Sequence, residues 1–473
     1  MTATAIVWFR RDLRLEDNPA LAAALESGAR VACVYIHAPE EEAPWAPGAA
    51  SRWWLHHALA ALATALAKRG ARLHLFCGAS QTILENLARE IDAGSVYWNR
   101  LYEPAVIQRD AAIKQSLCLR GIAARSFNAS LLMEPWSIQT GDGKPYRVFT
   151  PYWRKARSQL QAQPPTRAPS RIGAVQVDGG LNLDALGLLP KIGWDSEFRK
   201  HWRPGEHGAQ ALLRRFHESA LGAYADERNR PDRDGTSRLS PHLHFGEIGP
   251  RQMFWALGES ARAEAEGTNA AEPYLRELGW RDFSHHLLYH FPNTARENLN
   301  SQFDAFPWAA GDRHLLARWQ RGTTGVPIVD AGMRQLWKSG WMHNRVRMIV
   351  ASFLTKNLRQ HWLQGAHWFW DTLVDADLAN NTQGWQWSAG CGADAAPYFR
   401  IFNPVSQGER FDPDGSYVRR WVPELKDVRA SLIHQPWLDP ALLEQCRYPA
   451  PIVDLRTSRE AALVAYRQMR GNS

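Results

Sequence analysis

Residues 235–240 read Gly-Thr-Ser-Arg-Leu-Ser, and Pro241 follows them. A glycine followed by two hydroxyls and an arginine offers backbone N–H groups, two O–H donors and a cation to one ligand. Ser240 before Pro241 is typical of a helix start, with serine as the N-cap and proline as the first helical residue. We therefore expect a phosphate to bind here, with a capped helix after a loop as the alternative.

A second segment places a carboxylate, an indole and a guanidinium at helical spacing. Glu277, Trp280 and Arg281 are three and four residues apart, so a helix would carry them on one face. Such a face indicates a binding site. The alternative is a surface Glu–Arg ion pair beside a half-buried tryptophan.

A third segment combines Trp341, Asn344 and Met348, which would share one helix face with Arg347 beside them. Asparagine inside an amphipathic stripe is costly unless it is hydrogen-bonded. Its presence therefore suggests a polar ligand at this face.

A fourth segment, residues 375–381, reads Asp-Ala-Asp-Leu-Ala-Asn-Asn and precedes Trp385 and Trp387. Two carboxylates and two amides can bind ribityl or ribose hydroxyls, or a metal. Calcium would need more oxygen ligands and a closing glutamate. In a separate segment, His286 and His290 are four residues apart but lack the H-E-x-x-H pattern, which favours a helix with ordinary histidines. We therefore expect no metal site.

Tryptophan and positive charge are both abundant in the chain. It has 22 tryptophans in 473 residues, ten of them between positions 280 and 387, and 56 Lys+Arg against 48 Asp+Glu. Flat rings with a net charge of +8 favour nucleotides and nucleic acid as partners. A basic but otherwise ordinary enzyme is the alternative.

The five cysteines are scattered and form no C-x-x-C pair, which favours a reducing compartment. No stretch approaches the roughly 20 apolar residues of a membrane helix, and no signal peptide is visible at the N-terminus. We expect a cytoplasmic protein without a membrane partner.

The elements that must position these residues fall into three regions, because 473 residues exceed what one core usually serves. Residues 1–130 alternate strands and helices, which predicts an α/β domain with a doubly wound, Rossmann-like parallel sheet. No G-x-G-x-x-G follows the first strand, so a standard dinucleotide site is not expected there. Residues 131–205 are predicted to form an inter-domain connector, broken by proline and glycine from about 158, and residues 206–473 a large all-α domain.

The individual elements follow the same patterns. The predicted strands are 5–9, 31–36, 73–76, 95–98 and 123–127. The predicted helices are 18–26, 51–69, 81–91, 104–120, 209–229, 250–262, 273–288, 314–320, 326–339, 343–360, 365–373 and 418–423.

Taken together, these segments resemble the photolyase/cryptochrome family, and most closely its class I photolyases for cyclobutane pyrimidine dimers. The resemblance covers nearly the whole chain. It is carried by Ile-Val-Trp-Phe-Arg-Arg-Asp-Leu-Arg at 6–14, Gly-Thr-Ser-Arg-Leu-Ser at 235–240, Trp-Met-His-Asn-Arg at 341–345, Asp-Ala-Asp-Leu-Ala-Asn-Asn at 375–381, and Asp-Ala-Ala-Pro-Tyr-Phe-Arg-Ile-Phe-Asn-Pro at 394–404.

The resemblance implies an FAD held in the helical domain, active in its reduced anionic form, which donates an electron to a dimer after absorbing light. The residues implied at FAD are Tyr224, Thr236, Ser237, Arg238, Leu239, Ser240, Arg281, Arg347, Asp375, Asp377 and Asn381. Arg347 would pair with Asp375, and Asn381 would lie at the flavin N5. The chemistry is the cofactor's, and the protein positions and tunes it.

The resemblance also implies that UV-damaged DNA is the substrate, with the dimer flipped out of the duplex, as photolyases do. Glu277 and Asn344 would hydrogen-bond the dimer, Trp280 and Trp387 would pack against its rings, and Met348 would cover it. Arg228, Arg345 and Gln407 would contact the DNA backbone. Relatives that repair (6-4) photoproducts carry histidines where this chain has Asn344 and Met348, which disfavours that reaction.

Three tryptophans match the family's photoreduction path: Trp385 nearest the flavin, then Trp362, then Trp319 at the surface. A second, antenna chromophore is also implied. Folate-binding relatives have Asn-Glu where this chain has Ala105 and Val106, so folate in its usual site is in doubt, and a deazaflavin, a flavin or an empty site stay open.

A cryptochrome, a light receptor without repair activity, is the alternative function. The chain ends at Ser473 without a signalling tail, and Asn381 is photolyase-like, since many plant cryptochromes carry aspartate there. A nucleic-acid-binding module without catalysis would leave Asp375, Asp377 and Arg347 unexplained. We expect a monomeric enzyme.

Overall fold

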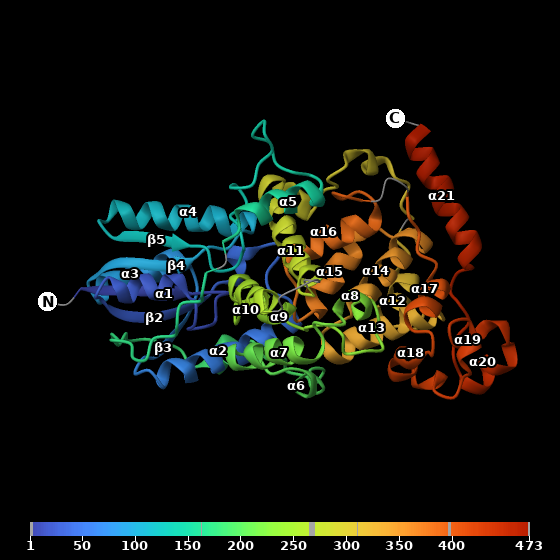
Figure 1. Cartoon of the computed structure of the whole chain (residues 1–473), viewed down its shortest axis with the longest axis horizontal. Coiled ribbons are helices and arrows are strands. Elements are labelled where there is room, and N and C mark those ends of the chain that lie inside the picture. Colours follow the sequence, from blue (N-terminus) through green and yellow to red (C-terminus); the bar gives the residue numbers. More distant parts are fainter. Residues whose placement is uncertain (1–2, 162, 264–269, 310, 396–398, 472–473) are drawn as a thin grey trace. The chain divides into compact units, whose positions relative to one another are not determined.

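The computed structural model describes residues 3–161, 163–263, 270–309, 311–395 and 399–471 (Figure 1). The chain divides into two compact units. The first contains Met1–Tyr146, Thr150–Gly222 and Ser237–Pro292, and the second contains Arg147–Phe149, Ala223–Thr236 and Asn293–Ser473. The limits of these units differ from the expected boundaries at residues 130 and 205, because most of the connector and residues 237–292 belong to the first unit.

The first unit contains a five-stranded parallel sheet in the order β3-β2-β1-β4-β5. Its strands are β1 (Thr4–Phe9), β2 (Arg30–His37), β3 (Leu73–Cys77), β4 (Ala93–Asn99) and β5 (Ala123–Phe127), and the helices between them are α1 (Pro19–Glu26), α2 (Ala49–Ala67), α3 (Ser80–Glu90) and α4 (Pro104–Leu119). The predicted doubly wound sheet is therefore confirmed.

The core of the sheet explains why these short apolar runs form strands. Ile6 and Trp8 of β1 are buried together with Val96 and Trp98 of β4, and Leu84 and Leu117 from α3 and α4 belong to the same cluster. Strands buried on both faces need continuous apolar runs, which is the pattern of residues 5–9 and 31–36.

The predicted connector follows the sheet. Isolated bridges join Val31 to Ala174 and Leu75 to Leu181, and short helices interrupt the segment. The helices in and after it are α5 (Phe149–Gln159), η2 (Leu183–Leu186), α6 (Phe198–His201), α7 (Glu206–Ser219), α9 (Ser240–His244), α10 (Pro250–Ala263) and α11 (Glu272–His290). The predicted helix 209–229 is wrong in extent: α7 ends at Ser219, and α8 (Tyr224–Glu227) is a separate turn.

The second unit is helical. Its main helices are α12 (Arg313–Gln320), α13 (Pro327–Ser339), α14 (Asn344–Ser352), α15 (Trp362–Thr372), α16 (Leu378–Ala389), α17 (Pro404–Phe411), α18 (Ser416–Trp421), α20 (Pro440–Cys446) and α21 (Leu455–Gly471). The predicted helix 343–360 is shorter than expected, because α14 continues as a π-helical turn, η5 (Phe353–Asn357). Gly340 and Gly390 end α13 and α16 in the left-handed conformation.

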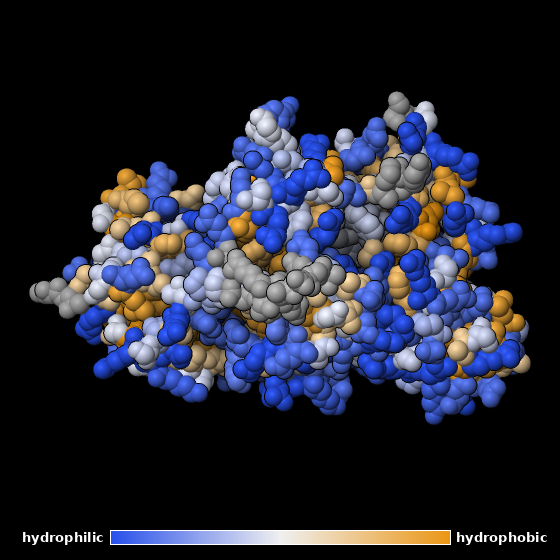
Figure 2. Space-filling model, viewed as in Figure 1, coloured by the Kyte–Doolittle hydropathy of each residue, from blue (hydrophilic) through white to orange (hydrophobic). Residues whose placement is uncertain are grey.

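The face in Figure 2 is mostly hydrophilic, with small apolar patches. Within the described ranges, no helix is long and apolar enough to cross a membrane. The five cysteines are all free.

Candidate functional site

The predicted phosphate-binding segment leads into the short helix α9. The buried Ser237 hydroxyl lies 2.8 Å from the Tyr274 hydroxyl and accepts a bond from the Leu239 N–H at 3.3 Å. Arg238 adopts the left-handed conformation, with φ at 55°. Hydroxyl, amide and guanidinium groups therefore occur together at this turn.

The predicted helix start at Ser240 is wrong by one residue. Leu239 is the N-cap, with φ −85° and ψ −1°, and it has no capping side chain. The left-handed Arg238 turns the chain one residue earlier than the Ser-Pro pair indicated, so Ser240 is already helical. Serine–proline spacing alone could not reveal this, because the decisive conformation lies two residues upstream.

Helix α11 carries Glu277, Trp280 and Arg281, all half-buried. A Cβ at Gly279 would lie 2.4 Å from the Trp153 ring, so α11 packs closely against that indole. At about 100° per residue, Glu277 and Arg281 project from the opposite side of the helix. The Arg281 guanidinium donates to the Ser130 carbonyl, which fixes the direction of that side chain.

Asp282, beside this face, was missed by the sequence analysis. Its Oδ2 accepts a bond from the Met133 N–H at 2.9 Å, and its side chain is buried. Burial raises the pKa of the Asp282 carboxyl to about 6, although the nearby Arg281 charge opposes the shift. A carboxylate inside an apolar helical stretch is the signal that could have identified it.

In the second unit, the predicted pair between Arg347 and Asp375 is present. The Arg347 Nη2 lies 2.8 and 3.1 Å from the two Asp375 carboxylate oxygens, and its Nε donates to the Met342 carbonyl. The Asp375 side chain is 2% exposed. A buried carboxylate with a matched guanidinium supplies a fixed ion pair to this part of the unit.

The polar loop after Asp375 leads into α16. Asp377 is the N-cap of that helix and accepts bonds from the Asn380 N–H and side-chain amide at 2.9 and 2.7 Å. The Asn381 amide nitrogen donates to the Ala366 carbonyl of α15 at 3.0 Å. In the described part of the chain, no three His, Cys, Asp or Glu side chains form a metal-binding group.

The predicted shared face of Trp341, Asn344 and Met348 is only partly correct. Helix α14 begins at Asn344, with His343 as its N-cap, so Trp341 precedes the helix. Asn344 is exposed in the first turn, and Met348 lies one turn later, half-buried. An exposed asparagine needs no buried partner, so the desolvation argument for a ligand fails at this position.

Trp385 occupies a tightly formed site between α15 and α16. A Cβ at Gly365 would lie 2.0 Å from the Trp385 ring, so only glycine allows the ring to lie there. The rings of Phe369 and Trp319 have their centroids 5.0 and 6.1 Å from that of Trp385. The Trp385 Nε1 is buried and has no hydrogen-bond partner among the described residues.

The predicted place of Trp319 at the surface is wrong. Its side chain is fully buried, and its Nε1 donates to the Val350 carbonyl at 3.1 Å. Trp319 contacts Trp385 directly, so it is a neighbour of the first ring and not the end of the series. Helix α12 is amphipathic, and its register places Trp319 on the inner face.

Trp362 is also buried, and its Nε1 donates to Asn298 at 2.9 Å. Its ring stacks on His361 with centroids 5.7 Å apart, and His361 lies 5.1 Å from Trp308, which is half-buried. Trp308, which had no predicted role beyond packing, is therefore the more exposed tryptophan on the Trp362 side.

An arginine cluster surrounds Arg345. The Arg345 guanidinium donates to the Asn229 side chain at 2.7 Å and lies 4.6 Å from the centre of the Phe411 ring. Burial lowers the pKa of Arg345, and the charges of Arg228, Arg410 and Arg400 lower it further. Like charges gathered at one place are stabilised by an anion.

The remaining predicted residues of the second unit lie as follows. Tyr224 is buried, with Arg228 5.5 Å above its ring, and Thr236 is half-buried. Trp387 is half-buried beside Phe402, with centroids 6.4 Å apart. Gln407 lies on α17, and its Oε1 is buried without a partner among the residues described. In the first unit, Val106 is fully buried in α4, where it packs in the core.

Family models match both the N-terminal and the C-terminal part of the chain. A family model described as the FAD binding domain of DNA photolyase matches residues 274–468, and one described as DNA photolyase matches residues 5–170. The deoxyribodipyrimidine photo-lyase of Agrobacterium fabrum is 48% identical over 98% of each chain. Cryptochrome-2 of Arabidopsis thaliana is 40% identical over 97% of this chain and 78% of its own.

Solved structures give the same result. A bacterial class III photolyase from Agrobacterium tumefaciens superposes with a TM-score of 0.95 and 47% identity, covering 100% of this chain and 98% of that one. An archaeal photolyase from Sulfolobus tokodaii, solved with two FAD molecules, gives 0.84 and 32%, covering 98% and 100%. These relatives span several branches, so they support the family and leave the class I assignment untested.

Proposed function

Because the chain belongs to the photolyase/cryptochrome family, we propose that it repairs cyclobutane pyrimidine dimers in DNA with the energy of blue or near-UV light. The observation that carries this proposal is the arginine cluster at the start of α14, where the guanidinium groups of Arg345 and Arg410 lie 4.6 and 5.1 Å from the centre of the same Phe411 ring. Phosphates of a DNA backbone carry the negative charge that would balance several neighbouring guanidinium groups.

The residues present fit an FAD. Ser237 and Arg238 bring a hydroxyl and a cation to one turn, as phosphate binding needs. Tyr224, Thr236, Leu239 and Ser240 complete the proposed phosphate-side set. Bound reduced FAD supplies the electron that splits the dimer after excitation. The protein's own residues bind and orient it.

The isoalloxazine side would be formed by Arg281, Arg347, Asp375, Asp377 and Asn381. The Arg347–Asp375 ion pair fixes the positions of two charges, which supports a preorganised environment. The Asn381 side-chain nitrogen donates to the Ala366 carbonyl. Its Oδ1 is therefore the atom expected to accept a hydrogen bond from a flavin N–H.

The dimer would be bound by Glu277 and Asn344 through hydrogen bonds, by Trp280 and Trp387 through ring packing, and by Met348 as a cover. Asn344 and Met348 lack the acid–base chemistry of histidine, which supports dimer splitting over (6-4) repair. Arg228, Arg345 and Gln407 would contact the DNA backbone.

For photoreduction of a resting oxidised flavin, we propose Trp385 as the first electron donor. The direct contact between Trp385 and Trp319 supports electron transfer between these two rings. Trp362, His361 and Trp308 form a second series of neighbouring rings, which ends at the half-buried Trp308. For the antenna position a deazaflavin, a flavin or an empty site stay open, and the two FAD molecules in the Sulfolobus tokodaii structure keep a flavin among these alternatives.

The proposal is tested with the FAD-loaded, photoreduced protein and an oligonucleotide that carries one thymine dimer. Blue light should restore intact thymines, and the same mixture kept dark should not. A cryptochrome-type receptor is the second candidate, favoured by the 40% identity to Cryptochrome-2. Stable FAD photoreduction without any loss of dimer would support the receptor and overturn repair.

A further inference from the structure

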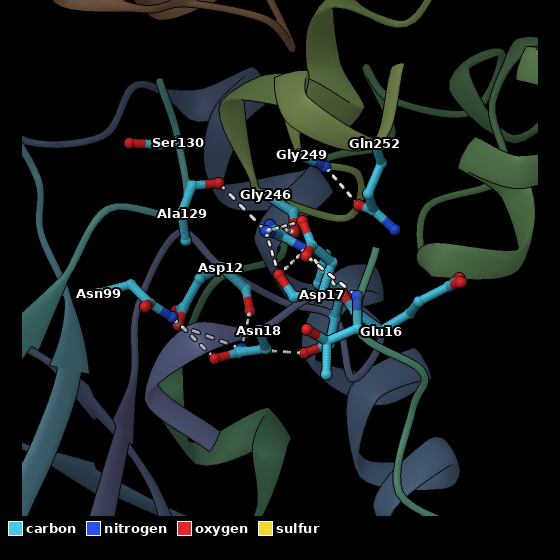
Figure 3. Close-up of polar contacts among 12 residues, drawn as sticks. Asp12, Glu16, Asp17, Asn18, Asn99, Ala129, Ser130, Gly246, Gly249 and Gln252 are labelled. Atoms are coloured by element: carbon cyan, nitrogen blue, oxygen red, sulfur yellow. Dashed lines mark hydrogen bonds and ion pairs between the residues drawn. The ribbon is translucent and has the colours of Figure 1, made fainter. Parts of the chain in front are cut away.

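The turn after β1 contains a buried arginine that the proposed chemistry does not use. Arg14 is 1% exposed, and its guanidinium donates to four carbonyls. These are Glu16 at 3.0 Å, Asp17 at 2.7 Å, Ala129 at 3.1 Å and Gly246 at 2.9 Å. Figure 3 shows these groups converging from segments far apart in the sequence. The donors of the guanidinium are thus used to join backbone segments.

The turn itself is held on the sheet. The Asn99 side chain, at the end of β4, donates to Asp12 at 2.6 Å and to Asn18 at 2.8 Å (Figure 3). Asn18 in turn donates to the Arg14 carbonyl at 3.1 Å. The position of Arg14 is therefore set by the carboxyl end of the parallel sheet.

The segment after α9 approaches this turn closely. Gly246 has φ at 63°, and a Cβ there would lie 2.2 Å from the Arg11 carbonyl. A Cβ at Gly249 would lie 2.8 Å from the Arg14 guanidinium. The Leu13 N–H also donates to the Phe245 carbonyl at 3.0 Å. The end of α9 and the next five residues can therefore shift only if the turn shifts as well.

A buried carboxylate holds the same segment from another direction. The Glu247 Oε1 accepts bonds from the Trp54 indole at 3.1 Å and the Gly205 N–H at 2.6 Å. Its Oε2 contacts His242 Nδ1 within α9, and both side chains are fully buried. Arg14 and Glu247 therefore hold the two neighbouring residues Gly246 and Glu247 against the α/β part of the first unit.

We propose that Arg14 and Glu247 are positioning residues for the FAD phosphates, acting through α9. Because α9 is short, fixing the residues after its C-terminal end also fixes the backbone of residues 237–240 at its start. This inference rests on the proposed binding of the FAD phosphates to that turn. Neither side chain contacts the phosphates in the proposal; each fixes the backbone that does.

The test compares two arginines of the same turn in the full-length, FAD-loaded protein. Lysine at position 14 keeps the charge but has three donors on one nitrogen, which cannot reach four carbonyls in a fork. The matched control is Arg10→Lys, because Arg10 is also buried and donates to Asn99 and Asp110, away from α9. A third variant, Glu247→Gln, keeps the size of the carboxylate.

Two measurements separate positioning from general stability. FAD release, followed by flavin fluorescence, should be about tenfold faster in Arg14→Lys and Glu247→Gln, and within about twofold of the unmodified chain in Arg10→Lys. The ³¹P resonances of the bound pyrophosphate should shift in the first two variants and stay fixed in the control.

Unshifted ³¹P resonances in Arg14→Lys, or equal release from both arginine variants, would overturn the inference. The proposed phosphate site itself is tested by Ser237→Ala. If this variant binds FAD with the same ³¹P resonances as the unmodified chain, the proposed phosphate site is overturned instead. The two failures are therefore distinguishable.

Discussion

Arg14 in the first unit is fully buried and Arg345 in the second is half-buried, and their surroundings also differ. Arg14 is surrounded by carbonyl oxygens that use its donors. Arg345 is close to three further arginines, and its guanidinium donates hydrogen bonds to the side-chain oxygen of Asn229. The first pattern is complete within the chain, whereas the second is the one that the proposed function completes with a DNA phosphate. Local balance of charge and donors thus separates a structural guanidinium from a binding one.

The contrast between the surroundings of Arg14 and Arg345 is tested most directly by replacing Arg14. Replacement with methionine should lower the free energy of unfolding by about 4 kcal/mol, because buried carbonyls lose their donor. Urea denaturation measures the change. A loss below about 1 kcal/mol would show that the carbonyls find other partners and that the pattern is not structural.

Asp282 offers a pH-dependent test in the same unit. Its pKa rises from 3.8 to about 6 on folding, so protonation stabilises the folded state. This stabilisation is complete below about pH 4 and is lost between about pH 4 and pH 6, amounting to about 3 kcal/mol. Asp282→Asn should remove that decline when unfolding is measured across this range. An unchanged pH profile would exclude Asp282 as its source.

Glu277, a charged residue of the first unit that is proposed to bind the dimer, sharpens the comparison. Glu277→Ala should slow dimer splitting by about 10- to 100-fold through loss of a charge-assisted hydrogen bond, while FAD stays bound. Repair rates under single-turnover illumination, with flavin absorbance as the control, measure this. Near-normal splitting would remove the role assigned to Glu277.

Arg345 should give the smallest effect and the opposite profile to Arg14. Arg345→Ala should weaken binding of damaged DNA by about tenfold and reduce the salt dependence by about one counterion, without loss of stability. Titrations at several salt concentrations measure both. Destabilisation without loss of DNA affinity would make the two arginines alike.

The sheet could be predicted because each strand is a short apolar run bounded by a helix start, a local signal. The Arg347–Asp375 pair also followed, from a resemblance that relates distant positions. The role of Arg14 did not, because its partners Ala129 and Gly246 are 115 and 232 residues away. Spacing along a chain holds no information on such contacts.

The errors have local physical causes. The left-handed Arg238 moved the start of α9, and the π-helical turn of η5 ended the regular α-helical pattern after Ser352. Trp319 was expected at the surface from the family's photoreduction path, and a match in sequence order does not give the depth of a side chain. Its place on the inner face of α12 became visible only with the helix register.

Gly365 shows how a missing side chain can determine the position of a reactive one. The Trp385 ring occupies the volume that any larger residue at 365 would need. Variation at 365 is therefore variation in the placement of Trp385, even though glycine itself has no redox chemistry. In a mutational scan of light-dependent flavin reduction, substitutions at Gly365 should therefore reduce the rate as strongly as substitutions at Trp385. A scan of stability alone would not reveal that the two positions affect the same ring.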